Sequence, residues 1–184
     1  MSLAHPWLEQ EPWPTASMPI DMLEKRIERV LTMTNIGYLA TTMKNGQPNV
    51  TPLEFYNDEF SLYFFPQPGS PKVKAMQRDP RVALAVANPM AGWACIMGCQ
   101  VFGTATLLDV DSPEWERGMK IFKWTASNFE LGRGFDEVPR GQLGRLDADR
   151  IVYTEHMMRK EGYAPRQIWR KGESEAKVVP GRNV

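Results

Sequence analysis

The sequence predicts a mainly β protein, a six- or seven-stranded antiparallel barrel with helices at its margins. From residue 38 onward, runs of strand-forming residues alternate with tight-turn signals, which is typical of an antiparallel meander. The run 93–108 is long for a strand in a small sheet, and it contains Gly98 and Gly103. Because such a strand has to curve, we expect these glycines to mark bends or bulges that help a barrel to close.

The first regular element is a helix over residues 21–33. Pro19 precedes it, and Asn35 and Gly37 follow it as stop signals. Its apolar residues recur at helical spacing and form one stripe that faces a core. The stripe consists of Leu23, Ile27, Val30 and Leu31.

Two strand-like runs, 38–42 and 49–56, lie on either side of Asn45-Gly46. This dipeptide favours a two-residue hairpin of type I′, in which both central residues have positive φ. The sequence therefore predicts that the two runs pair as an antiparallel hairpin.

A second turn is expected at Asn57-Asp58, before a third strand at 60–65. The second strand contains Pro52, which has no N–H to donate to a neighbouring strand. We therefore expect the second strand to have an unpaired position there.

The rest of the chain alternates short helices with strands. A helix is expected at 71–78, a fourth strand at 81–87, and the long strand after a loop at 88–92. The later elements are a helix capped by Asp111 or Ser112 and reaching about Phe129, a loop over 131–149 and a last strand over 151–157.

Length and charge restrict the domain count and the partners. The 184 residues suit a single domain, which we place at 19–170, between an extended segment at 1–18 and a flexible tail at 171–184. Lysine and arginine number 22, as do aspartate and glutamate, so the formal net charge is zero and nucleic acid is not an expected partner. No apolar run approaches the ~20 residues that cross a bilayer, so no membrane partner is expected.

The two cysteines, Cys95 and Cys99, are too few for a disulfide framework. In one strand they would face the same side but lie well apart along it. Reduced thiols and a cytoplasmic location are therefore expected, and no signal peptide is recognisable.

Metal binding and nucleophilic catalysis have little support. The histidines are His5 and His156, and no cysteine or histidine pair has zinc spacing with further ligands nearby. Cys99 could pair with His156, although a buried, inert cysteine is far commoner. The glycine motifs of nucleotide-binding loops are also absent. The sequence therefore identifies no metal ligand, no nucleotide-binding loop and no catalytic residue.

The most informative segment begins at Ser70, which occupies a helix N-cap position with Pro71 at the first helical position. Lys72 and Lys74 follow in the first turn, where the helix dipole favours acidic residues. Two lysines beside free backbone N–H groups and a hydroxyl favour an anion site, and a short surface helix with solvated lysines is the alternative.

Two neighbouring segments could complete a site for a flat phosphate ester. Residues 51–55 lie on the second strand, and Phe64-Phe65 end the third. A heterocycle needs apolar surface and a strand edge whose backbone can form hydrogen bonds with it. Each segment taken alone is more typical of ordinary strand packing.

The order of elements and several motifs resemble the pyridoxamine-phosphate-oxidase-like FMN-binding split barrels. The resemblance covers about residues 36–153, and its most specific part is the segment from Ser70 to Val82. The motifs that carry it are Asn45-Gly46-Gln47-Pro48, Tyr63-Phe64-Phe65, Gly69-Ser70-Pro71-Lys72-Val73-Lys74, Arg78-Asp79-Pro80-Arg81-Val82, Gly103-Thr104-Ala105 and Arg150-Ile151-Val152-Tyr153.

The resemblance implies a split β-barrel that forms a homodimer, with FMN in a groove between the subunits. It implies that Ser70 and Lys72 hold the phosphate, with Lys74 close by. It places Phe65 near the ribityl chain and Gln100 near the ring. The strand expected to face the isoalloxazine edge contributes Thr51, Pro52, Leu53 and Glu54.

The chain departs from the pattern of the vitamin B6 oxidases at three places. Pro71 stands where those enzymes carry arginine before the phosphate lysine, and residues 51–56 lack their arginine and lysine. Their C-terminal Arg-x-His substrate motif is absent, since the chain reads Arg166-Gln167-Ile168. The resemblance therefore implies flavin binding without implying vitamin B6 as the substrate.

The leading functional prediction is a flavoprotein oxidoreductase that acts on a small molecule. In such a protein the flavin performs the redox chemistry and the chain positions it. One alternative is a flavin or haem carrier without turnover, for which His156 is the candidate axial ligand. Another is a deazaflavin-dependent reductase on the same fold.

Overall fold

A computed structural model describes residues 13–89 and 92–179. His5 and Trp7, with the rest of the expected N-terminal segment up to residue 12, lie outside the described residues. The elements are, in chain order, α2 Ile20–Thr32, β1 Ile36–Thr42, β2 Pro48–Asp58, β3 Ser61–Phe64, α3 Pro71–Arg78, β4 Arg81–Ala87, η1 Trp93–Cys95, β5 Met97–Leu108, α4 Pro113–Ile121, α5 Trp124–Glu130, β6 Leu143–Glu155, η2 His156–Glu161, β7 Arg166–Arg170 and β8 Lys177–Val178.

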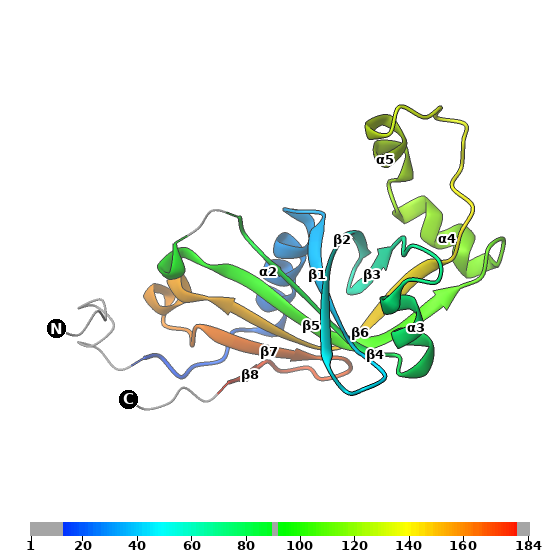
Figure 1. The fold of residues 1–184 in the computed structure, drawn as a ribbon. Coiled ribbons are helices and arrows are strands. Elements are labelled where there is room, and N and C mark those ends of the chain that lie inside the picture. Colours follow the sequence, from blue (N-terminus) through cyan, green and yellow to red (C-terminus); the bar gives the residue numbers. More distant parts are fainter. Residues whose placement is uncertain (1–12, 90–91, 180–184) are drawn as a thin grey trace.

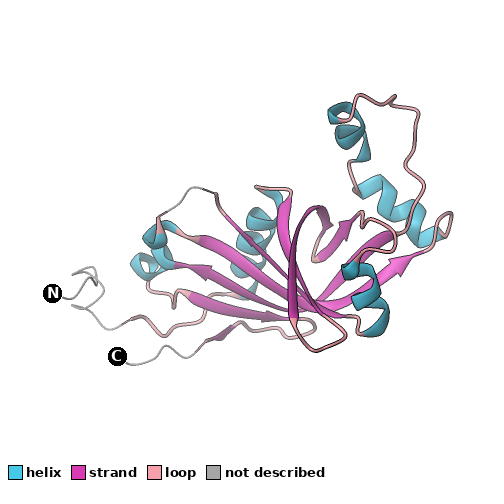
Figure 2. Ribbon diagram, in the orientation of Figure 1, coloured by secondary structure: helices cyan, strands magenta, loops and turns pink. Residues whose placement is uncertain are grey.

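Six antiparallel strands close a barrel, as the sequence predicts. Their order is β3-β2-β1-β4-β5-β6, and β3 pairs with β6 to complete the ring, while β7 and β8 continue the sheet beyond β6. The long β6 makes this arrangement possible. Residues 144–147 of β6 pair with β3, and residues 150–154 pair with β7. The sheet therefore divides along β6, with the helices at its margins (Figures 1 and 2).

The barrel interior is a continuous apolar core. Leu39, Leu84, Val101 and Ile151 face one another across four strands and are completely buried. The predicted stripe of α2 is buried against the same core, and so are two side chains of α3. Each such aliphatic side chain stabilises the fold by about 1.5–3 kcal/mol relative to an exposed one, so both helices are firmly anchored.

A second apolar cluster lies outside the barrel, between α4 and the strands that close it. Trp115, Met119 and Phe122 pack there on Tyr63 of β3 and Leu143 of β6. The indole Nε1 of Trp115 also donates to the carbonyl of Gly141, at 2.8 Å. The cluster fixes residues 111–142, called the arm below, which extends away from the barrel (Figure 1).

The predicted bend at Gly103 is confirmed. The register of β5 against β6 shifts between Phe102 and Gly103, so that Asp149 is the extra residue of a bulge. A Cβ atom on Gly103 would lie 2.0 Å from the carbonyl oxygen of Asp147, so no larger residue fits. The register at Gly98 is regular, and that glycine is not a bulge.

The first hairpin does not use the predicted type I′ turn. Only Gly46 has a positive φ, of 81°, and its N–H donates to the carbonyl of Met43 at 2.9 Å. The Asn45 side chain accepts a hydrogen bond from Gln47 N at 3.1 Å, which holds Asn45 in an Asx turn. The loop is therefore a longer one that ends in a left-handed glycine. The second turn lies at Glu59, because β2 continues to Asp58.

The helix predicted to reach Phe129 is broken into α4 and α5. Ser112 caps α4, as expected, and accepts from Trp115 N at 3.2 Å. Phe122 leaves the helical conformation and packs edge-to-face on Tyr56, with ring centroids 5.4 Å apart. Burial of this aromatic ring therefore competes with helix continuity and interrupts the helix.

Two strand boundaries differ from the prediction. The expected strand over 93–108 begins as η1, so Cys95 is exposed outside the strand while Cys99 is buried within it. β6 begins at Leu143, inside the expected loop over 131–149. Leu143 packs outside the barrel and Leu146 inside, but the glycines and charged residues of this stretch are also typical of a loop.

The C-terminal part of the domain is also more ordered than the sequence indicates. β7 was not predicted, and residues 171–179 turn back so that β8 pairs with β7, where a flexible tail was expected. Within the described residues, no helix has the length and apolar character that crossing a bilayer requires.

The chain before α2 lies along the end of the barrel. Ala16 forms a parallel bridge with Tyr163, and the Trp13 ring packs edge-on against His156, at 5.8 Å between centroids. His156 is only 4% exposed. Burial lowers the pKa of His156, and the nearby guanidinium groups of Arg166 and Arg159 lower it further.

Gly103→Ala is expected to destabilise the protein by about 3 kcal/mol or more, because the backbone at the bulge would have to move. The measurement is the urea-unfolding midpoint, compared with that of Gly92→Ala, whose added Cβ meets no atom within 4 Å. Equal midpoints for the two variants would contradict this account of the bulge.

The buried His156 is expected to make stability depend on pH. Its folded-state pKa lies below its unfolded value, so the unfolded chain binds more protons as the pH falls below about 6.5. The free energy of unfolding should therefore decrease from pH 7.5 to 5.5, and His156→Gln should flatten this dependence. Identical slopes for the two proteins, measured by urea unfolding at each pH, would refute the assignment.

Candidate functional site

The barrel has an opening along one edge of β2. β3 pairs with β2 only at residues 55–58, whereas β1 pairs with residues 48–54. The segment 48–54 therefore has a single neighbour, and every second residue directs its backbone N–H and C=O away from β1. Pro52 lies in this segment, which explains how the strand accommodates a residue without an N–H.

The N-terminus of α3 follows this opening in the chain. Ser70 occupies the N-cap position and Pro71 the first helical position, as predicted, but the Ser70 side chain does not cap the helix. The Ser70 hydroxyl oxygen is fully buried and has no hydrogen-bond partner among the described residues. A buried hydroxyl left unpaired costs about 1–3 kcal/mol, so this position suits an acceptor or donor supplied by a ligand.

The charges at this end of α3 are uncompensated locally. The first turn contains no acidic residue, and Lys72 is half-buried while Lys74 is exposed. A helix N-terminus carries partial positive charge, which adds to that of the two lysines. The structure therefore places a buried hydroxyl and positive charge where the sequence predicts an anion site.

Glu54 lies on the same strand edge and is held by three donors. Its carboxylate accepts from the Tyr56 hydroxyl at 2.8 Å, the Ser127 hydroxyl at 2.8 Å and Asn35 Nδ2 at 3.1 Å. Burial raises the pKa of Tyr56, and its hydrogen bond to Glu54 raises it further, so the phenol stays a donor. Ser127 belongs to α5, so this contact connects the arm to β2.

Glu54 and Phe65 line a pocket between β2 and the arm. The pocket has a volume of about 260 Å³. Asn128, which is almost completely buried, donates to the carbonyls of Gly134 and Glu137 and fixes the loop that closes one side. The other lining residues are Phe122, Trp124, Ser127, Leu131, Arg133 and Pro139.

The sequence did not identify the arm as part of the site. Ser127 and Trp124 lie some 70 residues after Glu54, and no spacing rule relates them. Ser127 and Asn128 lie among other polar residues such as Thr125 and Glu130, so no local pattern singled them out. This contact depends on the break after Phe122, which the sequence analysis also missed.

The four predicted residues of β2 lie on two faces. Thr51 is opposite Leu39, a core residue, and Leu53 is packed against the core, so both face the barrel interior. Pro52 is opposite Tyr38, which is 53% exposed, and Glu54 shares this outer face. A ligand on the outer face would thus contact the side chains of Pro52 and Glu54, and only the backbone of the other two.

Gln100 is on the outer face as well, but it lies apart from the other predicted residues. It pairs with Ala85 of β4, which is next to β1, which is next to β2. Three strand spacings amount to about 14 Å. The structure therefore does not bring Gln100 to the β2 edge of its own chain.

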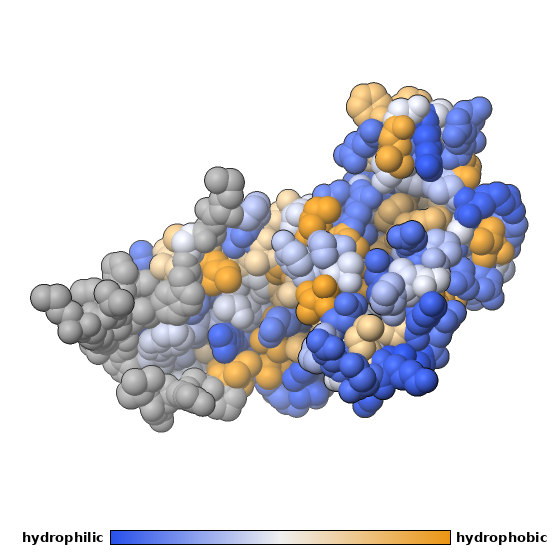
Figure 3. Space-filling model, viewed as in Figure 1, coloured by the Kyte–Doolittle hydropathy of each residue, from blue (hydrophilic) through white to orange (hydrophobic). Residues whose placement is uncertain are grey.

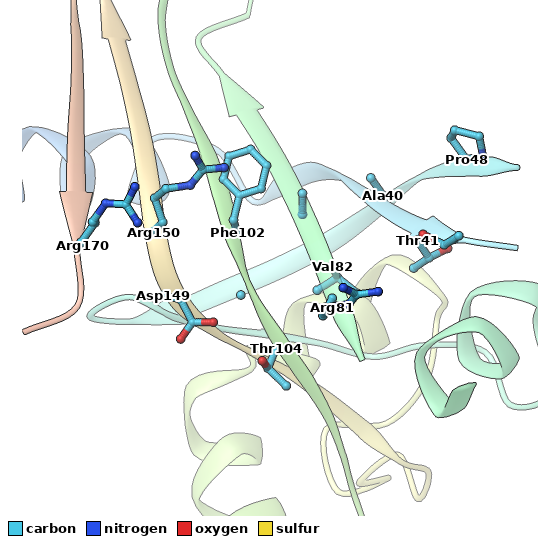
Figure 4. Close-up of a pocket in the computed structure, with 13 residues that line it drawn as sticks. Ala40, Thr41, Pro48, Arg81, Val82, Phe102, Thr104, Asp149, Arg150 and Arg170 are labelled. Carbon is cyan, nitrogen blue, oxygen red and sulfur yellow. The ribbon is translucent and has the colours of Figure 1, made fainter. Parts of the chain in front are cut away.

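A groove crosses this outer face from β2 to β7, with a volume of about 560 Å³ (Figure 4). Its floor includes Ala40 and Phe102, and the guanidinium of Arg150 lies over the Phe102 ring at 4.1 Å. Arg170 is directly opposite Arg150 in the register of β6 and β7. The groove is thus a basic, partly apolar surface with small side chains at its centre.

The described residues give little support to a metal site, a reactive thiol or a haem ligand. No group of three histidine, cysteine or acidic side chains that could hold a metal ion occurs there. Burial raises the pKa of Cys99, which disfavours the nucleophilic thiolate. His156 is buried behind Trp13, so the candidate axial ligand has no open side for a haem iron.

Solved structures with similar folds include a haem-binding protein, a general stress protein and an FAD-binding protein. A haem-binding protein from Mycobacterium smegmatis has a TM-score of 0.61 and 16% identity over 80% of this chain, which spans just over half (56%) of that protein. General Stress Protein 26 from Bacillus anthracis has a TM-score of 0.59 and 21% identity, over 80% of this chain and 98% of that one. An FAD-binding protein from Mesorhizobium loti has a TM-score of 0.55 and 22% identity, over 76% of this chain and 95% of that one.

These identities are low, so the likenesses show a shared fold. No curated protein sequence matches the chain. The family described as pyridoxamine 5'-phosphate oxidase matches residues 23–155, which is well over half of the chain and includes the opening at β2 and the N-terminus of α3. The chain therefore belongs to the pyridoxamine 5'-phosphate oxidase family.

Proposed function

We propose that this protein binds FMN at the opening along β2 and is an oxidoreductase acting on a small molecule. The observation that carries the proposal is the buried hydroxyl of Ser70, unpartnered among the described residues, at a helix N-terminus beside Lys72. A phosphate oxygen would satisfy the hydroxyl and the free N–H groups of the first turn. The open edge of β2 supplies backbone groups for the heterocycle.

Different residues of this chain would bind the phosphate and the apolar part of the cofactor. Ser70 and Lys72 bind the phosphate, Lys74 adds positive charge nearby, and Phe65 provides apolar surface beside the β2 edge. When bound, FMN supplies the hydride or electron transfer. The chain binds and orients the cofactor, and the arm over Glu54 limits the access of water to that side.

A homodimer completes this proposal. Gln100 lies about three strands from the β2 edge of its own chain, so it can reach a flavin there only from a second copy. Its neighbour on β4, Ala85, is small and exposed, and Tyr38 beyond it on β1 is 53% exposed. Figure 3 shows further apolar residues on the arm, where Phe129 is 73% exposed. Exposed apolar surface of this kind is typical of interfaces.

We also propose a cytoplasmic location. Cys95 is exposed and Cys99 buried, and both are free thiols, as reducing conditions would keep them.

The absorption spectrum of the purified protein tests the proposal. Flavin bands are expected, because the phosphate site and strand edge are formed within one chain. A Soret band would instead establish a haem protein, and a colourless protein that does not take up added FMN would refute the proposal.

Lys72→Ala is expected to weaken FMN binding by about 1–3 kcal/mol, the range for loss of a charge-assisted hydrogen bond. The measurement is a titration of flavin fluorescence. Lys44→Ala, an exposed lysine in the hairpin turn, is the control and should bind FMN as the unaltered protein does. Equal affinities for all three proteins would remove Lys72 from the site.

Ala85→Arg is expected to dissociate the homodimer, because it places a long charged side chain beside Gln100 on the outer face. Light scattering after gel filtration should give the mass of one chain for the variant and of two chains for Glu28→Arg, a control on the exposed side of α2. A dimeric Ala85→Arg protein would place the interface elsewhere.

A further inference from the structure

The pocket beneath the arm is lined mostly by residues that have no part in the proposed flavin site. Three aromatic side chains, Phe65, Phe122 and Trp124, contribute to its walls, and Glu54 is its only acidic lining residue. An apolar cavity of roughly 150 Å³ already accommodates benzene. A volume of about 260 Å³ therefore fits a single aromatic ring with one short substituent.

The carboxylate of Glu54 has acceptor capacity left. Its Oε1 accepts from Tyr56 and Asn35, while Oε2 accepts only from Ser127. Each carboxylate oxygen offers two lone pairs, so Oε2 can accept one more hydrogen bond. With three donors already holding it, the carboxylate is oriented for a ligand that donates an N–H or O–H.

The basic residues near the pocket do not offset this carboxylate. Arg133 is the only basic side chain that lines the pocket, and it lies exposed on the loop after α5. Lys123 has its ammonium over the Tyr56 ring, 5.4 Å from the centroid, and does not line the pocket. Exposed charges contribute little, whereas Glu54 is half-buried and held by three hydrogen bonds.

We propose that this pocket binds a single-ring aromatic amine or a similar hydrogen-bond donor through Glu54 and disfavours phosphate monoesters. A phosphate would bring its negative charge next to the Glu54 carboxylate, whose oxygens accept hydrogen bonds from three donors. That the ligand is the substrate rests on the function proposed above, because Glu54 and Phe65 belong to both sites. Binding in the pocket does not depend on the flavin.

Calorimetric titration with benzylamine and benzyl phosphate tests this proposal, on the protein as purified and after removal of any bound flavin. Benzylamine should bind at least ten times more tightly than benzyl phosphate. Glu54→Gln should weaken benzylamine binding tenfold or more, because it removes the negative charge and keeps the side-chain shape. The control is Glu28→Gln, an exposed carboxylate on α2 whose loss should have no effect.

A second variant protects the test from misfolding at Glu54. Leu131→Trp fills the pocket from the arm without touching the carboxylate, and it should abolish benzylamine binding. Tighter binding of benzyl phosphate, or unchanged benzylamine binding in both variants, would overturn the proposal. A protein that binds benzylamine as described but takes up no flavin would refute the proposed function while leaving the pocket assignment intact.

Discussion

The short pairing between β3 and β2 is the constraint on which the site depends. β3 has four residues, Ser61–Phe64, which pair on one edge with residues 55–58 of β2 and on the other edge with residues 144–147 of β6. If β3 were longer, it would cover the β2 edge and the barrel would have no opening. The length of β6 compensates, since one strand closes the barrel with β3 and still supports β7. Strand length thus determines both closure of the core and access to the site.

Local signals in the sequence were sufficient for most of the barrel. The stripe of α2, the strand β4 and the caps of α3 and α4 each depend on residues close together in the chain. The failures occur where long-range contacts decide. Phe122 interrupts a helix because Tyr56 receives its ring, and β6 begins inside a charged, glycine-containing stretch because that stretch pairs with β5 and β3. Neither contact can be inferred from spacing.

In the candidate site, too, local signals predict one part and long-range contacts determine the other. The N-terminus of α3 could be predicted, because Ser70, Pro71 and Lys72 are adjacent and their preferences are local. The pocket could not, because Ser127 reaches Glu54 only after the arm has folded over β2. Residues 51–54 were identified as a unit, yet the alternation of a strand separates them onto two faces. Local sequence signals thus identify the proposed phosphate site better than the proposed substrate pocket.

In the proposed FMN site, Pro71 helps α3 to hold a phosphate with fewer cations than the vitamin B6 oxidases, which this chain resembles. Proline fixes the backbone of the first turn and has no N–H of its own, so it orients the following N–H groups without competing for the anion. The Ser70 hydroxyl does not cap those groups, which leaves both the hydroxyl and the N–H groups of the first turn to a ligand. Preorganised dipoles thereby offset part of the missing charge, because binding an anion requires little rearrangement. Glu54 is the acidic residue that lines the pocket, and in the proposed site a carboxylate there favours a substrate chemistry different from that of a phosphate ester.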